Sequence, residues 1–379
     1  MKKEVNIAII GAGASGLMLG ALLREKNIII LDNNSKIGSK ILVSGGGKCN
    51  LTNGKVKPHN FLGNQRFVRN VIKRFNQDAV LEWFVSRGLK LLVRKRHQYF
   101  CEHSAKDVVD ILAKELPPKV IQLQSSVLSV SKKNDIFEIK TDQGIVLAKK
   151  LVVASGGLSF PKIGATSIGY DIAKSFGHEV TTLSAGLVGL TVQPEQAFFK
   201  SLSGISTEVK IKIDEKEIDG SLLFTHKGIS GPAVLDASLY WKKGKIVIDF
   251  LPNLNINVIK LLNKKLSNIL GLSNRLAKAL LEELKIEDKP CQKLSSEEWK
   301  KLESLKAYSF APAGTFGYSK AEVTQGGVST DEVDTSSMMS KKVDNLYFLG
   351  EVLDVTGELG GYNFQWAFST AYVCSKGIE

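Results

Sequence analysis

A short glycine-rich segment near the start of the chain has the residue types and spacing to bind nucleotide phosphates. Its glycines follow the pattern Gly11-x-Gly13-x-x-Gly16, and an acid, Asp32, comes 21 residues after the first of them. The first glycine permits a tight turn, the second lets a pyrophosphate approach the backbone, and the third lets a helix pack closely on a sheet. An acid at this distance accepts hydrogen bonds from the ribose hydroxyls of an adenine dinucleotide, which favours FAD or NAD over NADP.

The residues around the glycines predict the elements that would position them. Val5–Ile10 predicts a strand, Ser15–Glu25 a helix and Ile28–Leu31 a second strand. The free N–H groups at the start of the helix, near Ala14 and Ser15, would then point at the phosphates. The sequence therefore predicts a complete strand–helix–strand nucleotide-binding unit.

A secretory signal peptide is the alternative interpretation of the same segment. Two lysines precede a run of apolar and small residues that includes Ala-Gly-Ala, which would suit a cleavage site. Glu4 and Asn6 interrupt the expected order of a charged and then an apolar region. We therefore favour the nucleotide-binding unit and expect a cytoplasmic protein.

Composition limits the class of protein. A chain of 379 residues predicts two or three domains, and no run of about 18 apolar residues predicts a membrane span. Lys and Arg number 51 against 38 Asp and Glu, a net charge of +13. This charge suits a phosphate-rich partner, although a protein from a lysine-rich proteome would show it too.

The four cysteines are widely spaced, at Cys49, Cys101, Cys291 and Cys374. Without a C-x-x-C pair they predict neither a disulfide framework nor a zinc site, and we expect no metal. A reducing cytoplasm fits this usage best.

A second glycine-rich stretch, Ser44-Gly-Gly-Gly-Lys-Cys-Asn-Leu-Thr-Asn53, follows the ribose-binding acid. Its consecutive glycines permit backbone conformations closed to other residues, so the loop could wrap a flat ligand. Lys40 and Lys48 could neutralise phosphate or a reduced, anionic isoalloxazine, and the asparagines can hydrogen-bond. A flexible surface loop is the alternative, and Cys49 could be a redox thiol or a packing residue.

This stretch resembles the signature of the YhiN/BaiN-like family of FAD-dependent oxidoreductases, also described as aminoacetone oxidase family FAD-binding enzymes. The family usually has Arg where this chain has Lys48, which keeps the charge but loses the bidentate fork. The stretches Leu158–Asp171 and Phe224–Pro232 are also similar to the family's motifs. The resemblance implies that FAD is the cofactor and that Val127 makes a backbone contact to adenine.

The end of the chain predicts the other half of the cofactor site. A strand that ends at Gly350 is followed by acids and by glycines that open the last helix at Gly361. The positive N-terminus of that helix would stabilise negative charge on reduced flavin, which favours FAD over NAD. The predicted cofactor-binding residues are Gly11, Gly13, Ala14, Ser15, Gly16, Asp32, Asn33, Lys40, Ser44, Gly45, Gly46, Gly47, Lys48, Asn50, Thr52, Asn53, Val127, Ala154, Ser155, Gly156, Gly157, Gly350, Glu351, Asp354, Gly360, Gly361, Tyr362 and Asn363.

We predict an α/β fold, a Rossmann-like three-layer FAD-binding domain of the glutathione-reductase type, with an inserted β-plus-helical domain. The FAD-binding domain would comprise residues 1–186 and 308–379, and the insert 187–307, with a β-rich part to about 250 and a helical part after it. Helices are expected at Val258–Leu266, Leu276–Leu284 and Trp299–Leu305.

Basic residues cluster between residues 87 and 100. They are Arg87, Lys90, Arg94, Lys95 and Arg96, beside His97, Tyr99 and Phe100. Cations interleaved with aromatic rings could contact RNA through phosphates and base stacking, whereas the simpler interpretation is a solvated surface.

The resemblance implies an FAD-dependent oxidoreductase, and we favour reduction of an activated C=C bond with NAD(P)H as electron source. The substrate would be a small enone-type molecule or uridine in ribosomal RNA. The alternatives are an FAD-dependent amine oxidase that uses oxygen and a flavin-binding protein without turnover. No second GxGxxG motif provides an NAD(P)H domain, so the donor would bind transiently. The sequence predicts neither the oligomeric state nor one catalytic residue. The candidates are His226, Cys49, Lys48 and Tyr362.

Overall fold

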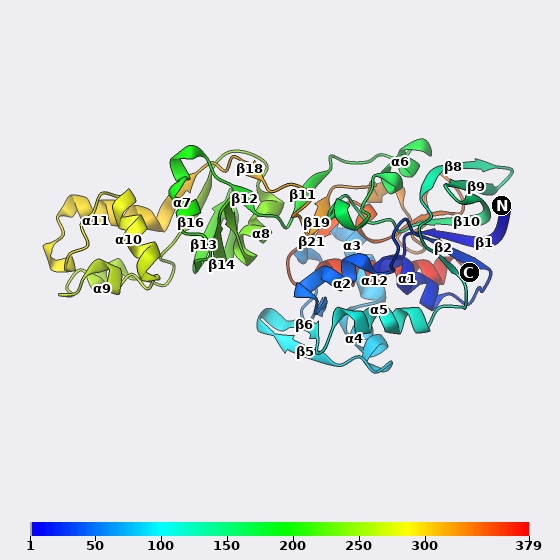
Figure 1. The fold of residues 1–379 in the computed structure, drawn as a ribbon, viewed down its shortest axis with the longest axis horizontal. Helices are drawn as coiled ribbons and strands as arrows, with labels where there is room; N and C mark the ends of the chain where they lie inside the picture. Colours follow the sequence, from blue (N-terminus) through cyan, green and yellow to red (C-terminus); the bar gives the residue numbers. More distant parts are fainter. Residues whose placement is uncertain (1, 379) are drawn as a thin grey trace. The chain divides into compact units, whose positions relative to one another are not determined.

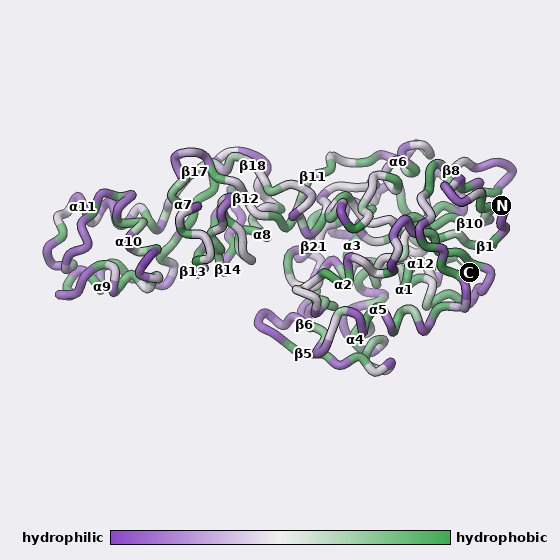
Figure 2. The backbone as a smooth tube through the Cα atoms, viewed as in Figure 1, coloured by the Kyte–Doolittle hydropathy of each residue, from purple (hydrophilic) through white to green (hydrophobic). Residues whose placement is uncertain are grey.

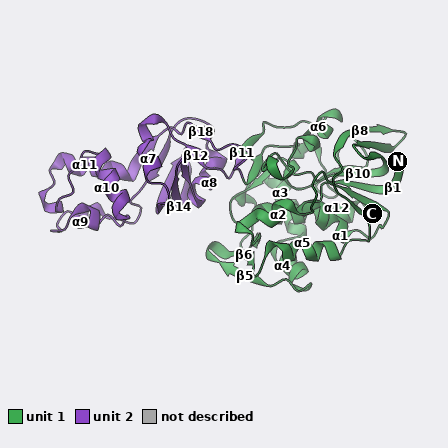
Figure 3. Cartoon of the chain, in the orientation of Figure 1, with its two compact units in different colours: residues 1–185, 322–379 green, residues 186–321 purple. Residues whose placement is uncertain are grey.

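The computed structural model describes residues 2–378, and the chain forms two compact units (Figure 3). The first comprises residues 1–185 and 322–379, and the second comprises residues 186–321. Each unit has its own hydrophobic core. Among the described residues, no helix is long and apolar enough to cross a membrane.

The first unit is built on a mostly parallel sheet (Figure 1). The strands are β1 (Lys2–Ile10), β2 (Ile28–Leu31), β7 (Ile121–Gln122), β8 (Val127–Lys133), β9 (Ile136–Thr141), β10 (Gly144–Val153) and β20 (Leu346–Phe348). The order is β7-β2-β1-β10, and β10 pairs with β20 near its end and with the antiparallel β9–β8 hairpin near its start. This topology confirms the predicted Rossmann-like fold.

The register of the sheet brings the ends of its parallel strands to one edge. Ile10 pairs with Leu31 on one side and with Val153 on the other, and Val153 pairs in turn with Phe348. The apolar residues from Val5 to Ile10 are almost all buried because parallel strands are covered on both faces. Ligands of such sheets bind outside this edge, where the loops leave the strands.

Helices pack around this sheet. They are α1 (Ala14–Leu22), α2 (Ser39–Val43), α3 (Gln65–Arg74), α4 (Gln77–Val85), α5 (Ala105–Lys114), α6 (Ile168–Ser175) and α12 (Tyr362–Gly377). Helix α12 packs against α1, α3 and α4, so the end of the chain lies on the first helix. Helix α1 is shorter than predicted, because the Asn27 carbonyl accepts the Asn6 N–H at 2.9 Å and the chain has already turned toward β2.

Two small sheets lie beside the glycine-rich loops of the first unit. Strand β6 (Gln98–Cys101) pairs with β5 (Leu91–Arg94) and with β3 (Asn50–Asn53). Strand β4 (Phe61–Gly63) pairs with β21 (Val355–Gly357). Segments far apart in the sequence are thus held together next to the edge of the main sheet. Short strands β11 (Ser184–Gly186) and β19 (Val323–Gln325) also pair, where the chain leaves and re-enters this unit.

The second unit contains an antiparallel sheet with the order β17-β16-β13-β14-β15-β12-β18. Its strands are β12 (Leu190–Thr191), β13 (Ser206–Ile213), β14 (Lys216–Thr225), β15 (Gly228–Ser230), β16 (Ile246–Asp249), β17 (Tyr308–Phe310) and β18 (Gly314–Thr315). Its helices are α7 (Phe198–Ser201), α8 (Pro232–Tyr240), α9 (Ile256–Ile259), α10 (Asn274–Glu283) and α11 (Ser296–Glu303). Phe199 lies at the centre of its core, with ring centroids 5.1 Å from Phe224 and 6.2 Å from Phe250.

Two predictions for this unit need correction. The chain returns to the first unit at residue 322 rather than 308, because β17 pairs with β16 and β18 pairs with β12. The helix expected over Val258–Leu266 is only the single turn α9. The Cys291 N–H donates to the Lys264 carbonyl at 3.1 Å, so this backbone pairs across the chain instead of within a helix.

Candidate functional site

The glycines of the first loop have different structural roles. A Cβ at Gly11, where φ is +108°, would lie 2.4 Å from the Ala154 carbonyl oxygen, and one at Gly16 would lie 1.9 Å from the Gly11 oxygen. A Cβ at Gly13 would have no atom within 4 Å. Gly11 and Gly16 are therefore required by the packing of the protein itself, whereas Gly13 leaves open space at the start of α1.

The start of α1 is suited to an anion. Gly13 is its N-cap and no side chain caps the helix, so the first N–H groups of Ala14 and Ser15 have no side-chain acceptor. Unsatisfied N–H groups and the helix dipole attract phosphate at such a position. The open space at Gly13 therefore coincides with a place that favours negative charge.

Asp32 is fixed by backbone hydrogen bonds. Its Oδ2 accepts the N–H of Ala12 at 2.6 Å and its Oδ1 accepts that of Asn34 at 2.8 Å. Because each carboxylate oxygen has two lone pairs, both can still accept a ribose hydroxyl. The Asp32 carbonyl also accepts the Ser125 N–H at 2.8 Å, and the contact of Val127, two residues further on, with adenine stays a prediction.

Four of the five positions 45–49 in the second loop have left-handed backbone. Gly45, Gly46 and Gly47 have φ of +55°, +66° and +81°, and Cys49 follows at +45°. Lys48 lies between them, and its Nζ donates to the carbonyls of Glu102 and His103 at 2.9 and 2.6 Å. Lys48 thus fastens the loop to the segment before α5, and its contact with a cofactor stays a prediction.

Cys49 and Cys101 are brought together although they lie far apart in the sequence. Their strands are antiparallel, with Asn50 opposite Phe100, and the Cys101 N–H donates to the Cys49 carbonyl at 3.4 Å. Both thiols are buried, and the neighbouring Cys101 thiol together with burial raises the pKa of Cys49 well above its ordinary value. Cys49 is therefore a protonated thiol at neutral pH, which suits a packing role better than a nucleophilic one.

Three predicted polar residues from Asn50 to Asn53 face different groups. Thr52 donates through Oγ1 to the Gln365 Oε1 at 2.6 Å, and Asn53 donates through Nδ2 to the Gly360 carbonyl at 3.1 Å. Both contacts hold the start of α12. Asn50 donates to the Gln98 Oε1 at 2.9 Å, but its own Oδ1 is buried and has no partner among residues 2–378.

The start of α12 lies against the second loop, and Gly350, which precedes it in the chain, lies against the first. A Cβ at Gly350 would lie 2.1 Å from the Ser15 Oγ, and one at Gly361 would lie 2.6 Å from the Thr52 carbonyl carbon. The Thr370 Oγ1 accepts the Gly350 N–H at 3.1 Å, so α12 also fixes the loop that precedes it. No side chain caps α12, which leaves its positive N-terminus available to an anionic group.

Lys40 and Glu351, both predicted to bind the cofactor, form an ion pair at 2.5 Å and are partly exposed. The Glu351 Oε1 accepts the Thr324 N–H at 2.9 Å, and a Cβ at Gly157 would lie 2.5 Å from the Thr324 Oγ1. The segment Ala154–Gly157 continues the same junction, since the Ala154 N–H donates to the Ile10 carbonyl at 2.9 Å. The predicted residues of all these segments therefore lie around one edge of the sheet.

Sequence reasoning missed several residues that build this site. They are Gln98, Cys101 and Gln365, and none of them gave a signal in the sequence. Thr324 belongs to the Gly-rich turn Ala321–Val328, for which the family resemblance implies a place beside the flavin. Its Oγ1 accepts the Leu158 N–H at 2.7 Å, although the two residues are 166 positions apart.

The candidate catalytic residues are distributed over both units. His226 is exposed on the turn between β14 and β15 of the second unit, and its ring makes no hydrogen bond within residues 2–378. Tyr362 is buried at the start of α12, edge-on to Phe61 with centroids 5.9 Å apart. The assignment of a catalytic role to any of them stays a prediction.

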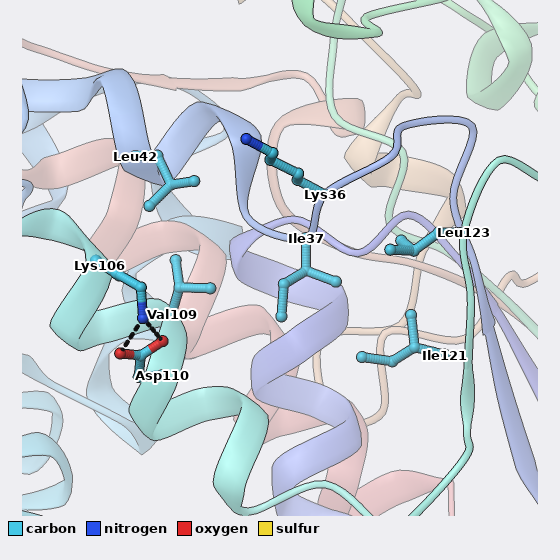
Figure 4. Close-up of a pocket in the computed structure, with 8 residues that line it drawn as sticks. All are labelled: Lys36, Ile37, Leu42, Lys106, Val109, Asp110, Ile121 and Leu123. Carbon is cyan, nitrogen blue, oxygen red and sulfur yellow. Dashed lines mark hydrogen bonds and ion pairs between the residues drawn. The ribbon is translucent and has the colours of Figure 1, made fainter.

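A surface pocket of about 820 Å³ lies elsewhere on the first unit (Figure 4). Its lining residues are Lys36, Ile37, Leu42, Lys106, Val109, Asp110, Ile121 and Leu123. None of them is a predicted cofactor-binding residue, and the two opposite charges, Lys106 and Asp110, pair with one another at 2.6 Å. Within residues 2–378, no three or more His, Cys, Asp or Glu side chains are grouped to hold a metal ion.

The family model described as "HI0933-like protein Rossmann domain" matches residues 5–377. The chain is 41% identical over 391 residues to a Haemophilus influenzae protein named "Ribosomal RNA dihydrouridine synthase", with 98% of both chains covered. An Escherichia coli protein of the same name is 39% identical, over 98% of this chain and 97% of its own. A Clostridium scindens "3-dehydro-bile acid delta(4,6)-reductase" is 31% identical, over 98% of both.

Solved structures share the fold at low sequence identity. A quinol-fumarate reductase aligns with a TM-score of 0.53 and 14% identity, over 99% of this chain and 71% of its own. A flavocytochrome c3 fumarate reductase aligns with a TM-score of 0.50 and 15% identity, over 99% and 78%. At this identity the likeness concerns the fold alone.

Proposed function

The chain belongs to the HI0933-like Rossmann-domain family and is an oxidoreductase, and from this premise we propose that it reduces the C5=C6 bond of uridine in ribosomal RNA with FAD as cofactor. The observation that carries the proposal is the match over 98% of both chains to a protein named for making dihydrouridine in ribosomal RNA. The geometry of the first unit supports the cofactor, and the net charge of +13 supports the nucleic acid.

The residues of the first unit fit FAD. The pyrophosphate would lie over Gly13 at the start of α1, where a Cβ would meet no atom, and the ribose hydroxyls would reach Asp32. An unpartnered buried carbonyl oxygen such as the Asn50 Oδ1 costs about 1–3 kcal/mol unless a ligand or water satisfies it. The ring N–H of a flavin is a donor of the required kind.

Reduction of uridine adds a hydride and a proton across a C=C bond that is conjugated to a carbonyl. When bound, FAD supplies the hydride. The positive N-terminus of α12 would stabilise negative charge on the reduced cofactor, and Lys40, partly neutralised by Glu351, would add a cation at the same edge of the sheet. The name of the Clostridium scindens relative, a bile-acid reductase, is compatible with the same class of reaction, a reduction, on a small molecule.

NAD(P)H is the proposed electron source. The sequence has no second GxGxxG motif, so the nicotinamide would enter transiently, donate its hydride and leave before the RNA binds. This order requires each reactant to reach the cofactor in turn.

An anaerobic titration tests the proposal. Purified protein with bound FAD should lose its visible flavin absorption on addition of NADPH or NADH and regain it on addition of unmodified ribosomal RNA made by in vitro transcription. Bleaching that the RNA does not reverse would contradict the proposal that ribosomal RNA is the substrate. The absence of bound flavin would contradict the proposal that FAD is the cofactor. Bleaching by an amine, with peroxide formed in air, would support the amine oxidase alternative instead.

A further inference from the structure

The positive charge of the chain is concentrated in one stretch of the first unit. Residues 48–101 contain twelve Lys and Arg and only two acids, Asp78 and Glu82, so this stretch carries an excess of ten of the net +13 charges. All of the twelve except Lys48 are exposed. This stretch also contains β3 and β6, the strands beside the glycine-rich loop.

In the structure, the members of the basic cluster that the sequence indicated have different surroundings. The Arg87 Nε lies 3.3 Å from the Glu115 Oε2, and its guanidinium stacks 4.1 Å from the centroid of the Trp83 ring. Arg87, which follows α4, is therefore already paired with a carboxylate. Arg94 instead ends β5, and Lys95 and Arg96 lie in the turn of the β5–β6 hairpin, where Figure 2 shows hydrophilic residues.

A second segment adds a cation to this turn. The Gly54 N–H donates to the His97 carbonyl at 2.8 Å, which places Lys55 directly beside the hairpin. We call Lys55, Arg94, Lys95 and Arg96 the basic tip. Lys55, Arg94 and Lys95 form no ion pair with any carboxylate of residues 2–378, so their charges are not neutralised within the described protein.

The basic tip is attached to the predicted flavin loops at two points. Arg94 stacks 4.4 Å from the centroid of Phe100, and the Phe100 Cε1 would lie 2.9 Å from a Cβ at Gly45. On the other side, the Asn53 Nδ2 donates to both the Arg96 carbonyl and the Gly360 carbonyl, each at 3.1 Å. The tip is therefore connected by single residues to the second glycine loop and to the start of α12.

The same contacts decide which face of the hairpin is turned toward the loops. Side chains alternate along a strand, so Gln98 and Phe100 of β6 share a face. Gln98 accepts the Asn50 Nδ2 and Phe100 contacts Gly45, so this is the face on the flavin loops. Arg94 is opposite Gln98 in the register and lies on it too.

We propose that the basic tip is the surface that binds the phosphates of single-stranded RNA next to the flavin loops, so that a uridine of the bound strand can enter the cofactor site. This inference rests on the proposed function. Phe100 is buried beneath Arg94 and cannot stack on a base, which corrects the aromatic part of the sequence hypothesis. The tip therefore acts through charge, which positions the strand, and does not select the sequence.

The test compares two triple variants in the full-length protein loaded with FAD. Arg94, Lys95 and Arg96 are replaced together by Gln, and the matched control replaces Lys242, Lys243 and Lys245, three exposed lysines on a turn of the second unit. Binding of an unmodified ribosomal RNA transcript is measured between low and moderate salt. Flavin content and Tm confirm that each variant is folded.

The tip variant should bind the transcript on the order of 10- to 100-fold more weakly at physiological salt, and its slope of log K against log salt should be shallower by about 2, since each phosphate contact contributes roughly 0.7 for single strands. The control should bind as the wild type does. Equal binding by all three proteins would overturn the basic tip and leave the proposed function intact. A wild type that shows no RNA binding would overturn both the RNA-binding role of the basic tip and the proposed function. An equal loss of binding in both variants would show non-specific charge attraction and would also overturn the role of the basic tip.

Discussion

Different kinds of contact stabilise the interior of each of the two compact units. In the first unit, polar side chains connect segments hundreds of residues apart, as Thr52 does with Gln365 and Lys40 with Glu351. In the second unit, the centre is an aromatic cluster around Phe199, and ion pairs such as Lys260 with Glu303 lie at the exposed surface. Both units have a hydrophobic core, but the first unit adds polar contacts between distant segments at the edge where we predict the cofactor.

Among substitutions that leave the first unit folded, one at Gly13 should have the largest effect on cofactor binding. Gly13 has extended dihedral angles, φ −87° and ψ −164°, that any residue can adopt, and a Cβ there meets no protein atom. Gly13→Val should therefore fold but occupy the space of the pyrophosphate, and bound FAD should fall to nearly none. Flavin absorption of the purified variant and its Tm, compared with wild type stripped of FAD, provide the measurement.

Gly16→Val provides the contrast within the same loop. Its side chain would collide with the Gly11 carbonyl oxygen, so this variant should lose the folded unit as well as the cofactor. If Gly13→Val kept its FAD, the assignment of this loop to the cofactor would be wrong.

In the second unit, Phe224→Ala should cost stability without affecting the cofactor. Phe224 is fully buried and packs against Phe199, and such truncations cost about 3–5 kcal/mol. Urea unfolding followed by tryptophan fluorescence should shift, while flavin content at low urea stays that of the wild type. Val258→Ala, at a 62% exposed position of the same unit, should change neither quantity. A loss of FAD in folded Phe224→Ala would contradict the claim that the core of the second unit does not affect cofactor binding in the first.

Asp32→Asn should weaken FAD binding less than Gly13→Val does. The change removes a charge-assisted acceptor, worth about 1.5–3 kcal/mol, so the Kd of FAD should rise roughly 10- to 100-fold. Asp110→Asn is the matched control, because Asp110 pairs with Lys106 beside the surface pocket. Reconstitution of stripped protein with FAD, followed by fluorescence quenching, gives both Kd values, and an unchanged value for Asp32→Asn would remove this residue from the site.

The smallest expected effect concerns two histidines, one in each unit. His178 is buried, with Nδ1 2.9 Å from the Glu332 Oε2 and Nε2 2.8 Å from the Ser340 Oγ. Burial, which outweighs the attraction of Glu332, lowers the pKa of His178 below its ordinary value, so the unfolded chain binds the proton more readily than the folded one. This contribution to stability is present above the unfolded pKa of about 6.5 and is lost as the pH falls below it.

Urea unfolding at several pH values checks this expectation. Wild type should lose stability more steeply between neutral and mildly acidic pH than His178→Gln, whereas His226→Gln, at an exposed position, should keep the wild-type slope. Parallel profiles for wild type and His178→Gln would show that the ring does not titrate with folding.

The parts of the first unit that the sequence predicted are those where only one residue type fits. Gly11 and Gly16 leave no space for a Cβ. Asp32 could be placed because it directly follows the apolar run Ile28–Leu31, which predicts a strand. The return of β17 and β18 to the sheet of the second unit could not be predicted, because short strands are fixed by pairing with distant partners. For the same reason Cys101 beside Cys49, and the link from Asn53 to Gly360, left no local signal.

The most direct test of the central claim is a count of dihydrouridine in ribosomal RNA. Unmodified transcript is incubated with the FAD-loaded protein and NADPH or NADH, digested to nucleosides and analysed by mass spectrometry, with Gly13→Val as the matched control. We predict that uridine gaining two hydrogens accumulates with the wild type and not with the variant. Wild type that oxidises the nicotinamide under these conditions but leaves every uridine unreduced would contradict the claim.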